Sequence, residues 1–341
     1  MLLIITIMND EIKDQTKNYL MPVSIIFSTL LLAGVWVYSI GKGEIQRTQQ
    51  ADVAGSFEKT ANTIMEEKVV PAAGVVLPIR WGDLGTQLVS TGVIDREKFE
   101  SIYANRGGLS ENERRLLRAT DNGAVTITSQ NAGVLLNLFW ALGLSAKNEI
   151  LEKGEMADPR YGGAENFAST GGWTIANGDP MDHYSAHTFF LLTPKQQKLV
   201  DKVSRGIYRP CCGNSVHFPD CNHGMAMLGF LELMASQGVS EQDMWNSALA
   251  VNSYWFPDTY LTIATYMEQK GIDWKNVNPK EVLGINYSSG QGFARIASQV
   301  ELPEEHSGGN GCGVDAGGSV APQPLPVVPK PSRGTQGGCG I

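Results

Sequence analysis

The sequence predicts a mainly α-helical globular domain with minor strand, preceded by an N-terminal transmembrane helix and followed by a disordered Gly/Pro-rich tail. Three observations predict this arrangement: an uncharged apolar run near the N-terminus, several helix-start signals in the middle, and a C-terminal segment made largely of Gly, Pro and Ser. With 341 residues, the chain is long enough for one large domain or two small ones with a buried core.

The apolar run at residues 21–40 is the expected membrane anchor. No charged residue occurs between Lys17 and Lys42. A helix of about 20 residues, rising about 1.5 Å per residue, crosses the roughly 30 Å hydrocarbon core. A cleavable signal peptide is the alternative, but its apolar core would be shorter and would precede a small-residue cleavage site. We therefore expect a single-pass anchor in the plasma membrane.

The orientation of the anchor decides where the domain works. Basic residues flank the run on both sides, so charge alone does not choose a direction. A short N-terminal side and a large C-terminal domain are typical of a signal-anchor with an extracytoplasmic domain. The expected organisation is a short N-terminal segment (1–18), the anchor (19–41), a stalk (42–74), the helical domain (75–305) and the disordered tail (306–341).

Helix signals are frequent after the stalk. Ser110, Thr193 and Ser240 each precede a Glu, Gln or Asp by three residues, as in a capping box at a helix start. Residues 71–79 are expected to be extended or loop, and the best strand candidate is the short run 124–128. Further helices are expected at residues 131–144, which are apolar nearly all round and should be buried, at 223–236 and at 258–270.

Composition and motifs exclude several function classes. The net charge of −8 and the pI near 5.2 make nucleic-acid binding unfavourable, because an acidic protein repels phosphate. The sequence contains no P-loop and no Gly-rich dinucleotide fingerprint between a strand and a helix, so no nucleotide cofactor is expected. No Ser elbow or kinase signature is present either. The sequence therefore assigns no particular reaction.

The cysteines are clustered. Three of the five, Cys211, Cys212 and Cys221, lie within one short segment, and His223 follows closely. Prolines and a glycine make this segment a loop between two expected helices, with Cys221 at the start of the second helix. A helix N-terminus favours thiolate, which is both a nucleophile and a metal ligand. The cluster is therefore the candidate site.

Two more histidines lie upstream of the cluster. His183 and His187 are four residues apart, and a helix beginning at Asp179 and Pro180 would project both rings from one face. The residue after His183 is Tyr184 rather than the Glu of a metalloprotease. Ordinary hydrogen-bonded histidines are the alternative. The full candidate metal-ligand set is Cys211, Cys212, Cys221, His223, His183 and His187.

The segment from about 200 to 255 resembles the membrane-anchored, extracytoplasmic helical thiol domain of cytochrome c biogenesis proteins. In that family a C-x-x-C pair lies between two helices, and a G-x-S segment begins the third. Here Cys211 and Cys212 match the location of the pair, although they are adjacent, and Gly238-Val-Ser240 matches the third-helix start. The Pro-Cys-rich loop also resembles uncharacterised exported lipoproteins. The first resemblance implies thiol redox chemistry.

Three functions follow from these patterns. The first is binding of a soft metal, zinc or copper, either structural or for metal handling. The second is thiol–disulfide exchange with an exported protein partner, with Cys221 as the reactive thiol and Cys211 or Cys212 resolving it. The third is a non-catalytic interaction module that a disulfide staples. A tail thiol, Cys312 or Cys339, could reach the cluster, pair within the tail or bind metal.

Overall fold

The computed structural model describes residues 62–300 of the chain. The expected anchor, most of the expected stalk, and the Gly/Pro-rich tail with Cys312 and Cys339 lie outside the described residues. Among the described helices, none is both long enough and apolar enough to span a membrane.

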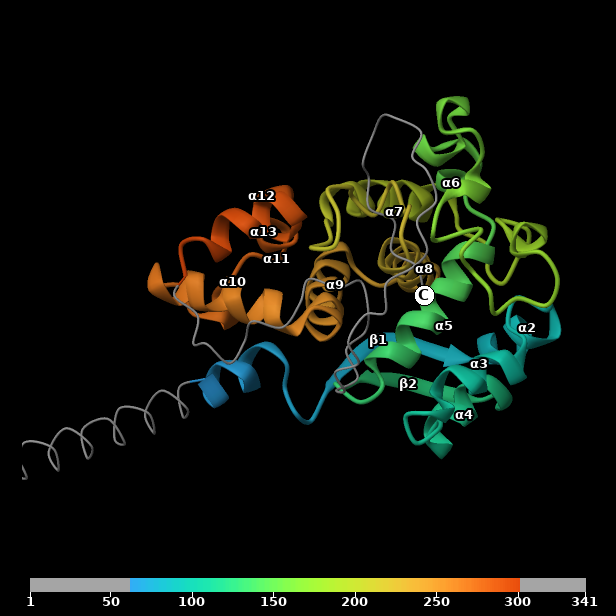
Figure 1. Cartoon of the computed structure of the whole chain (residues 1–341), viewed down its shortest axis with the longest axis horizontal. Helices are drawn as coiled ribbons and strands as arrows, with labels where there is room; N and C mark the ends of the chain where they lie inside the picture. Colours follow the sequence, from blue (N-terminus) through green and yellow to red (C-terminus); the bar gives the residue numbers. More distant parts are fainter. Residues whose placement is uncertain (1–61, 301–341) are drawn as a thin grey trace, which may run out of the picture. The chain divides into compact units, whose positions relative to one another are not determined.

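The described part of the chain is mainly helical, as the sequence predicts (Figure 1). A helical segment at residues 62–69 leads into the first strand. The strands are β1 (Val75–Gly82) and β2 (Asn122–Ile127). The helices are α2 (Leu84–Ser90), α3 (Arg96–Ala104), α4 (Glu111–Arg118), α5 (Ala132–Ser145), α6 (Glu149–Lys153), α7 (Pro194–Gly206), α8 (Asn222–Ser236), α9 (Glu241–Trp255), α10 (Pro257–Gln269), α11 (Pro279–Val282), α12 (Ile285–Ser288) and α13 (Gly290–Ala297).

The two strands form one antiparallel sheet. Val75 pairs with Ile127 at one end and Gly82 with Asn122 at the other, with an irregularity between Val76 and Arg80. The expected strand at 124–128 is confirmed as β2. Its partner β1 begins inside the segment expected to be extended or loop and continues beyond it. Only the tertiary pairing identifies β1 as a strand.

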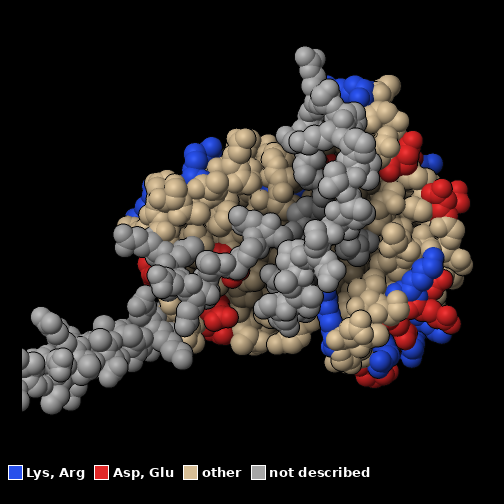
Figure 2. All heavy atoms as spheres, in the orientation of Figure 1, with Lys and Arg blue, Asp and Glu red and all other residues tan. Residues whose placement is uncertain are grey.

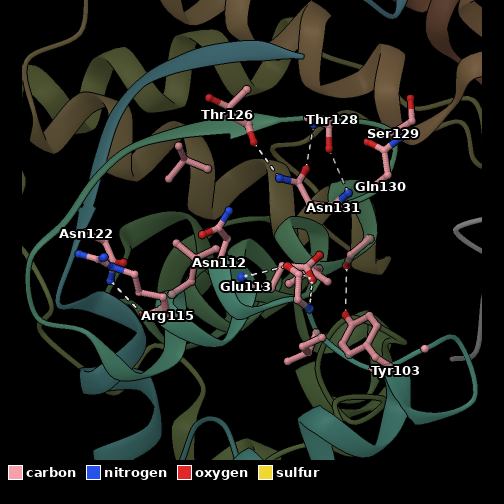
Figure 3. A pocket seen from close by; sticks show the side chains of 18 of the residues that line it. Tyr103, Asn112, Glu113, Arg115, Asn122, Thr126, Thr128, Ser129, Gln130 and Asn131 are labelled. Carbon is pink, nitrogen blue, oxygen red and sulfur yellow. Dashed lines mark hydrogen bonds between the residues drawn. The ribbon is translucent and has the colours of Figure 1, made fainter. Parts of the chain in front are cut away.

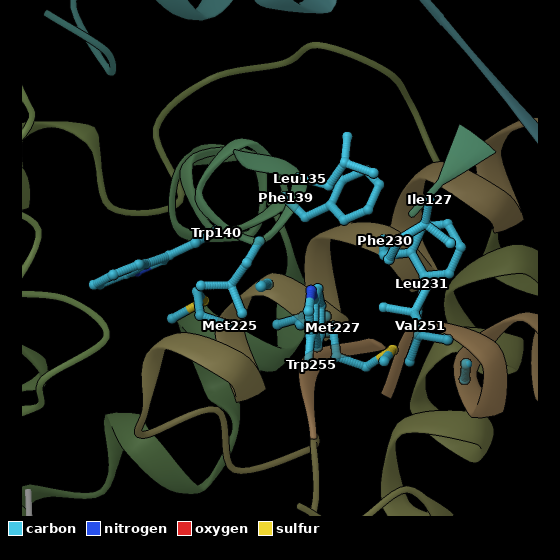
Figure 4. Packing of buried hydrophobic residues seen from close by; sticks show 14 of the residues in the cluster. Ile127, Leu135, Phe139, Trp140, Met225, Met227, Phe230, Leu231, Val251 and Trp255 are labelled. Atoms are coloured by element: carbon cyan, nitrogen blue, oxygen red, sulfur yellow. The ribbon is translucent and has the colours of Figure 1, made fainter. Parts of the chain in front are cut away.

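The core is built around α5 and α8, which pack closely along their lengths. Phe139 of α5 stacks on Phe230 of α8 with ring centroids 4.9 Å apart, and Figure 4 shows this layer within the buried cluster. Glycines allow the close approach. A Cβ on Gly143 would lie 2.1 Å from the Met225 carbonyl oxygen, and one on Gly229 would lie 2.4 Å from the Phe139 carbonyl oxygen. This packing fixes α8, whose first turn carries the candidate site.

The predicted helix starts are confirmed. Ser110 and Thr193 form complete capping boxes at α4 and α7, and the Ser240 side chain accepts from the Asp243 backbone N–H at α9. The helices expected at 131–144, 223–236 and 258–270 correspond to α5, α8 and α10. Gly238, with φ of +76°, follows the end of α8.

The domain includes part of the segment expected to be a stalk. Met65, Val69 and Val70 are buried in the core cluster. The Tyr254 hydroxyl donates to the Pro71 carbonyl oxygen at 2.7 Å. These contacts place the start of the packed domain before residue 75.

Charges of both signs share the surface around α3 and α4 (Figure 2). Glu100 accepts from Arg118 at 2.9 Å and lies 3.9 Å from Arg96. Such exposed pairs contribute little to stability. Because positive and negative side chains are mixed there, this part of the described domain carries neither a continuous basic patch nor a continuous acidic patch.

Candidate metal centre

The cysteine loop connects α7 to α8 and is held at several points. The Val216 N–H donates to the Ile207 carbonyl oxygen, and the Gly290 N–H donates to the Cys212 carbonyl oxygen, each at 2.8 Å. Cys221 is the N-cap residue of α8, as the sequence predicts. The loop is therefore fixed against both the start of α13 and the first turn of a core helix.

The loop and the helix bring two thiols and an imidazole together. Cys211 Sγ lies 3.7 Å from Cys221 Sγ, and both cysteines are free thiols. The ligand atoms of Cys211, Cys221 and His223 all lie within 4.8 Å of one another. Cys221 and His223 are buried, whereas Cys211 is half-buried. The group therefore has a closed side in the core and a side that reaches the surface.

The imidazole of His223 is neutral, and only one of its two nitrogens has a hydrogen-bond partner in the described part of the chain. Its Nδ1 lies 3.0 Å from Asn222 Oδ1, so Nδ1 carries the proton and donates to this acceptor. Its Nε2 is buried and has no hydrogen-bond partner within the described part of the chain. Burial lowers the pKa of His223 to about 3. Nε2 thus keeps an unshared lone pair at neutral pH.

Arg209 donates hydrogen bonds to several groups on the other side of the cysteine cluster. It is fully buried, and its Nη2 donates to Cys212 Sγ at 3.1 Å and to Asp220 Oδ1 at 2.7 Å. Its Nη1 donates to the Ser215 carbonyl oxygen at 2.8 Å. A Cβ on Gly224 would lie 2.7 Å from the guanidinium carbon. The glycine therefore lets this cation pack against the first turn of α8.

The three thiols affect one another's ionisation. The pKa of Cys212 is lowered, because the neighbouring thiols of Cys211 and Cys221 stabilise its thiolate and Arg209 adds positive charge. The pKa of Cys211 is raised, chiefly by its interaction with Cys212. Burial raises the pKa of Asp220, although Arg209 opposes this effect. A bound cation would compete directly with the thiol protons.

A second set of ligand atoms adjoins the first. Those of Cys212, Asp220 and Cys221 also lie within 4.8 Å of one another. Cys221 belongs to both sets and links them. Because Arg209 binds Cys212 and Asp220, this second set is already occupied by a cation of the protein itself.

The structure corrects the expected role of the upstream histidines. His183 Nδ1 lies 3.0 Å from His187 Nε2, and His183 Nε2 lies 3.2 Å from the Asn177 carbonyl oxygen. The helix that begins after Asp179 is a 3₁₀ turn ending at His183, and Ser185 then takes a φ of +50°. His183 and His187 still meet, but they pair with each other and do not join the cysteine groups.

A pocket of about 890 Å³ is lined by residues of α3, α4, β2 and the start of α5 (Figure 3). The Asn131 side chain closes part of it by donating to the Thr126 carbonyl oxygen and accepting from the Thr128 N–H, each at 2.8 Å. Its lining contains no Cys or His, so it does not share the chemistry of the cluster.

Sequence reasoning missed the polar residues that surround the thiols. Asp220 and Asn222 flank Cys221 in the chain, and Arg209 lies two residues before Cys211, and this proximity was the only available signal. Their contacts with the thiols depend on the packing of the loop against α8. No known protein-family model, characterised protein or solved structure matches this chain.

Proposed function

We propose that the protein binds one soft metal ion, Zn(II) or Cu(I), through Cys211, Cys221 and His223. The observation that carries this proposal is the 3.7 Å separation of the two sulfurs beside a buried imidazole nitrogen that has no partner in the described part of the chain. Thiolate and neutral imidazole are the ligands that these ions prefer.

The sulfur separation suits a shared ion. Two sulfurs, each about 2.3 Å from a tetrahedral zinc ion, lie about 3.8 Å apart. The observed 3.7 Å therefore requires almost no movement of Cys211 or Cys221. His223, two residues after Cys221 in the first turn of α8, supplies a third ligand. Its Asn222 hydrogen bond fixes the ring tautomer, as second-shell partners do at metal sites.

The partial exposure of the site favours metal handling over a purely structural role. Cys211 and Cys212 are half-buried, so a fourth coordination position faces the surface. A structural zinc site is typically closed by four protein ligands, whereas a site with three ligands exchanges its fourth. The predicted anchor would hold this site on the extracytoplasmic side of the plasma membrane, where it could receive an ion from, or pass one to, an exported partner.

Metal analysis of the full chain tests the proposal. The protein is purified without oxygen in detergent, and bound zinc and copper are measured per chain. We expect one equivalent in the unaltered protein and less than a tenth of an equivalent in Cys221→Ser and His223→Ala. Circular dichroism shows whether each variant is folded. Because a buried site can tolerate substitution poorly, Cys211→Ser at the half-buried position provides a second measurement.

The matched control is the double variant His183→Ala/His187→Ala. It removes two histidines that lie outside the cysteine groups, so the metal content should stay at one equivalent. A metal-free protein with two rapidly reactive thiols would instead support thiol–disulfide exchange. Equal metal content in folded Cys211→Ser, Cys221→Ser and unaltered protein would contradict the proposed ligand set.

A further inference from the structure

We infer that the metal centre is redox-gated: oxidation of Cys211 and Cys221 to a disulfide releases the ion. This inference rests on the proposed metal binding and adds a regulator to it. The same two sulfurs, 3.7 Å apart, are both the proposed metal ligands and a pair of thiols close enough to form a disulfide with a small movement. Binding of the ion and bond formation between the sulfurs are therefore mutually exclusive.

The geometry permits the closure. A disulfide has an S–S length of about 2.05 Å, so the sulfurs must approach by about 1.7 Å from their 3.7 Å separation. Cys221 is fixed as the N-cap of α8. Cys211 lies in the loop, and Gly213 nearby has open space around its backbone. Because the loop backbone is held by its hydrogen bonds, the half-buried side chain of Cys211 is the part that must move toward Cys221.

Cys212 is held out of this reaction. Arg209 Nη2 donates to its sulfur at 3.1 Å, and Gly290 N–H donates to its carbonyl oxygen at 2.8 Å. A bridge between the adjacent Cys211 and Cys212 would be strained. Oxidation should therefore select Cys211 and Cys221 and leave Cys212 as a free thiol beside Arg209.

The oxidant we propose is a small-molecule disulfide, RSSR. In the metal-loaded protein Cys211 is a thiolate, because the bound ion displaces its proton. The half-buried Cys211 thiolate attacks one sulfur of RSSR, which forms a mixed disulfide and releases RS⁻. The Cys221 thiolate then attacks Cys211 Sγ and displaces the second RS⁻. Two protein thiolates are oxidised, and RSSR is reduced to two thiolates. The ion keeps its charge but loses two of its three ligands, and His223 alone does not retain it.

Zinc release during oxidation tests the gate. The full chain, loaded with Zn(II), is treated with oxidised glutathione while a chromogenic chelator records free zinc. Cleavage before Asp220 separates Cys221 from the Cys211–Cys212 pair, so mass spectrometry detects any link between them. We expect one zinc released for each link formed, and recovery of zinc binding after reduction with a phosphine.

Two variants show which cysteines form the disulfide. Cys212→Ser should bind zinc, form the link and release zinc in the same ratio as the unaltered protein. In Cys211→Ser the link should be absent. Zinc that stays bound after the link has formed, a link that needs Cys212, or a stable mixed disulfide with glutathione would overturn the gate while leaving metal binding intact. A reduced protein that binds no zinc at the outset would overturn both.

Discussion

At the scale of single residues, three of the ionisable groups that the described domain buries have very different partners. Arg209 is matched by Cys212 and Asp220. His223 is kept neutral by burial. Glu232, fully buried on α8, has only the Asn148 side-chain amide as a donor to Oε1, and its Oε2 has no partner within the described residues. The surroundings of Glu232 and of Arg209 each lead to a testable prediction.

Burial raises the pKa of Glu232 well above its usual range, because the carboxylate loses its hydration in the core. The unfolded chain ionises it above about pH 4.3. Stability therefore falls as pH rises from there toward the folded-state pKa. We expect Glu232→Gln to increase the free energy of unfolding by about 1–2 kcal/mol at pH 8 and to flatten this slope. Urea titrations between pH 5 and 8 measure both.

Glu241 is a control, because its pKa is shifted in the opposite direction to that of Glu232. Hydrogen bonds from Lys202 and Lys280 lower its pKa to about 2, so its carboxylate contributes stability that is lost as pH falls below about 4.3. Glu241→Gln should not stabilise the protein at pH 8. If Glu232→Gln and Glu241→Gln behaved alike, the account of the buried acid would be wrong.

Arg209 should matter for stability because it is fully buried and its removal leaves the partly buried Asp220 and Cys212 without their cation. Breaking a buried pair in this way costs about 3–5 kcal/mol. We expect a loss of that size in Arg209→Met, measured by urea denaturation. Arg205→Met is the matched control, since Arg205 pairs with Asp201 at the surface at 3.0 Å, and it should cost about 1 kcal/mol or less. Equal losses would contradict the buried role of Arg209.

At the scale of secondary-structure elements, the crossing of α5 and α8 fixes the first turn of α8. A Cβ on Gly229 would lie 2.5 Å from the Gly143 backbone nitrogen, so the helices would have to separate. We expect Gly229→Ala to lower the free energy of unfolding by about 1–3 kcal/mol. Gly123→Ala, where a Cβ meets nothing within 4 Å, should change it by about 0.5 kcal/mol or less. A thermal scan of both variants that showed no difference would contradict this packing.

Elements differ in how well the sequence predicts them, and the difference is physical. The starts of α4, α7 and α9 were predictable because a cap is a local interaction between residues three apart, as at Ser110 and Glu113. The strand β1 was not, because its pairing with β2 joins distant segments. The spacing of His183 and His187 correctly suggested that they meet, whereas their absence from the cysteine groups depends on the tertiary fold. The thiols themselves were predictable from their clustering, whereas the burial of Arg209 was not.

At the scale of the whole molecule, the predicted anchor at residues 19–41 would determine where the proposed metal site works. We expect the full chain to stay with membranes through alkaline carbonate washing, because a helix of that length spans the hydrocarbon core. A chain that begins at residue 42 should appear in the supernatant and keep the same metal content. Recovery of the full chain in the supernatant would contradict the anchor and leave the metal proposal unaffected.

The central claim is that Cys211, Cys221 and His223 hold one soft ion, and X-ray absorption at the metal edge of the full chain tests it most directly. For zinc, we expect two sulfur scatterers at about 2.3 Å and at least one nitrogen scatterer at about 2.0–2.1 Å. In Cys211→Ser we expect the loss of one sulfur scatterer. A first shell made only of oxygen and nitrogen would contradict the claim.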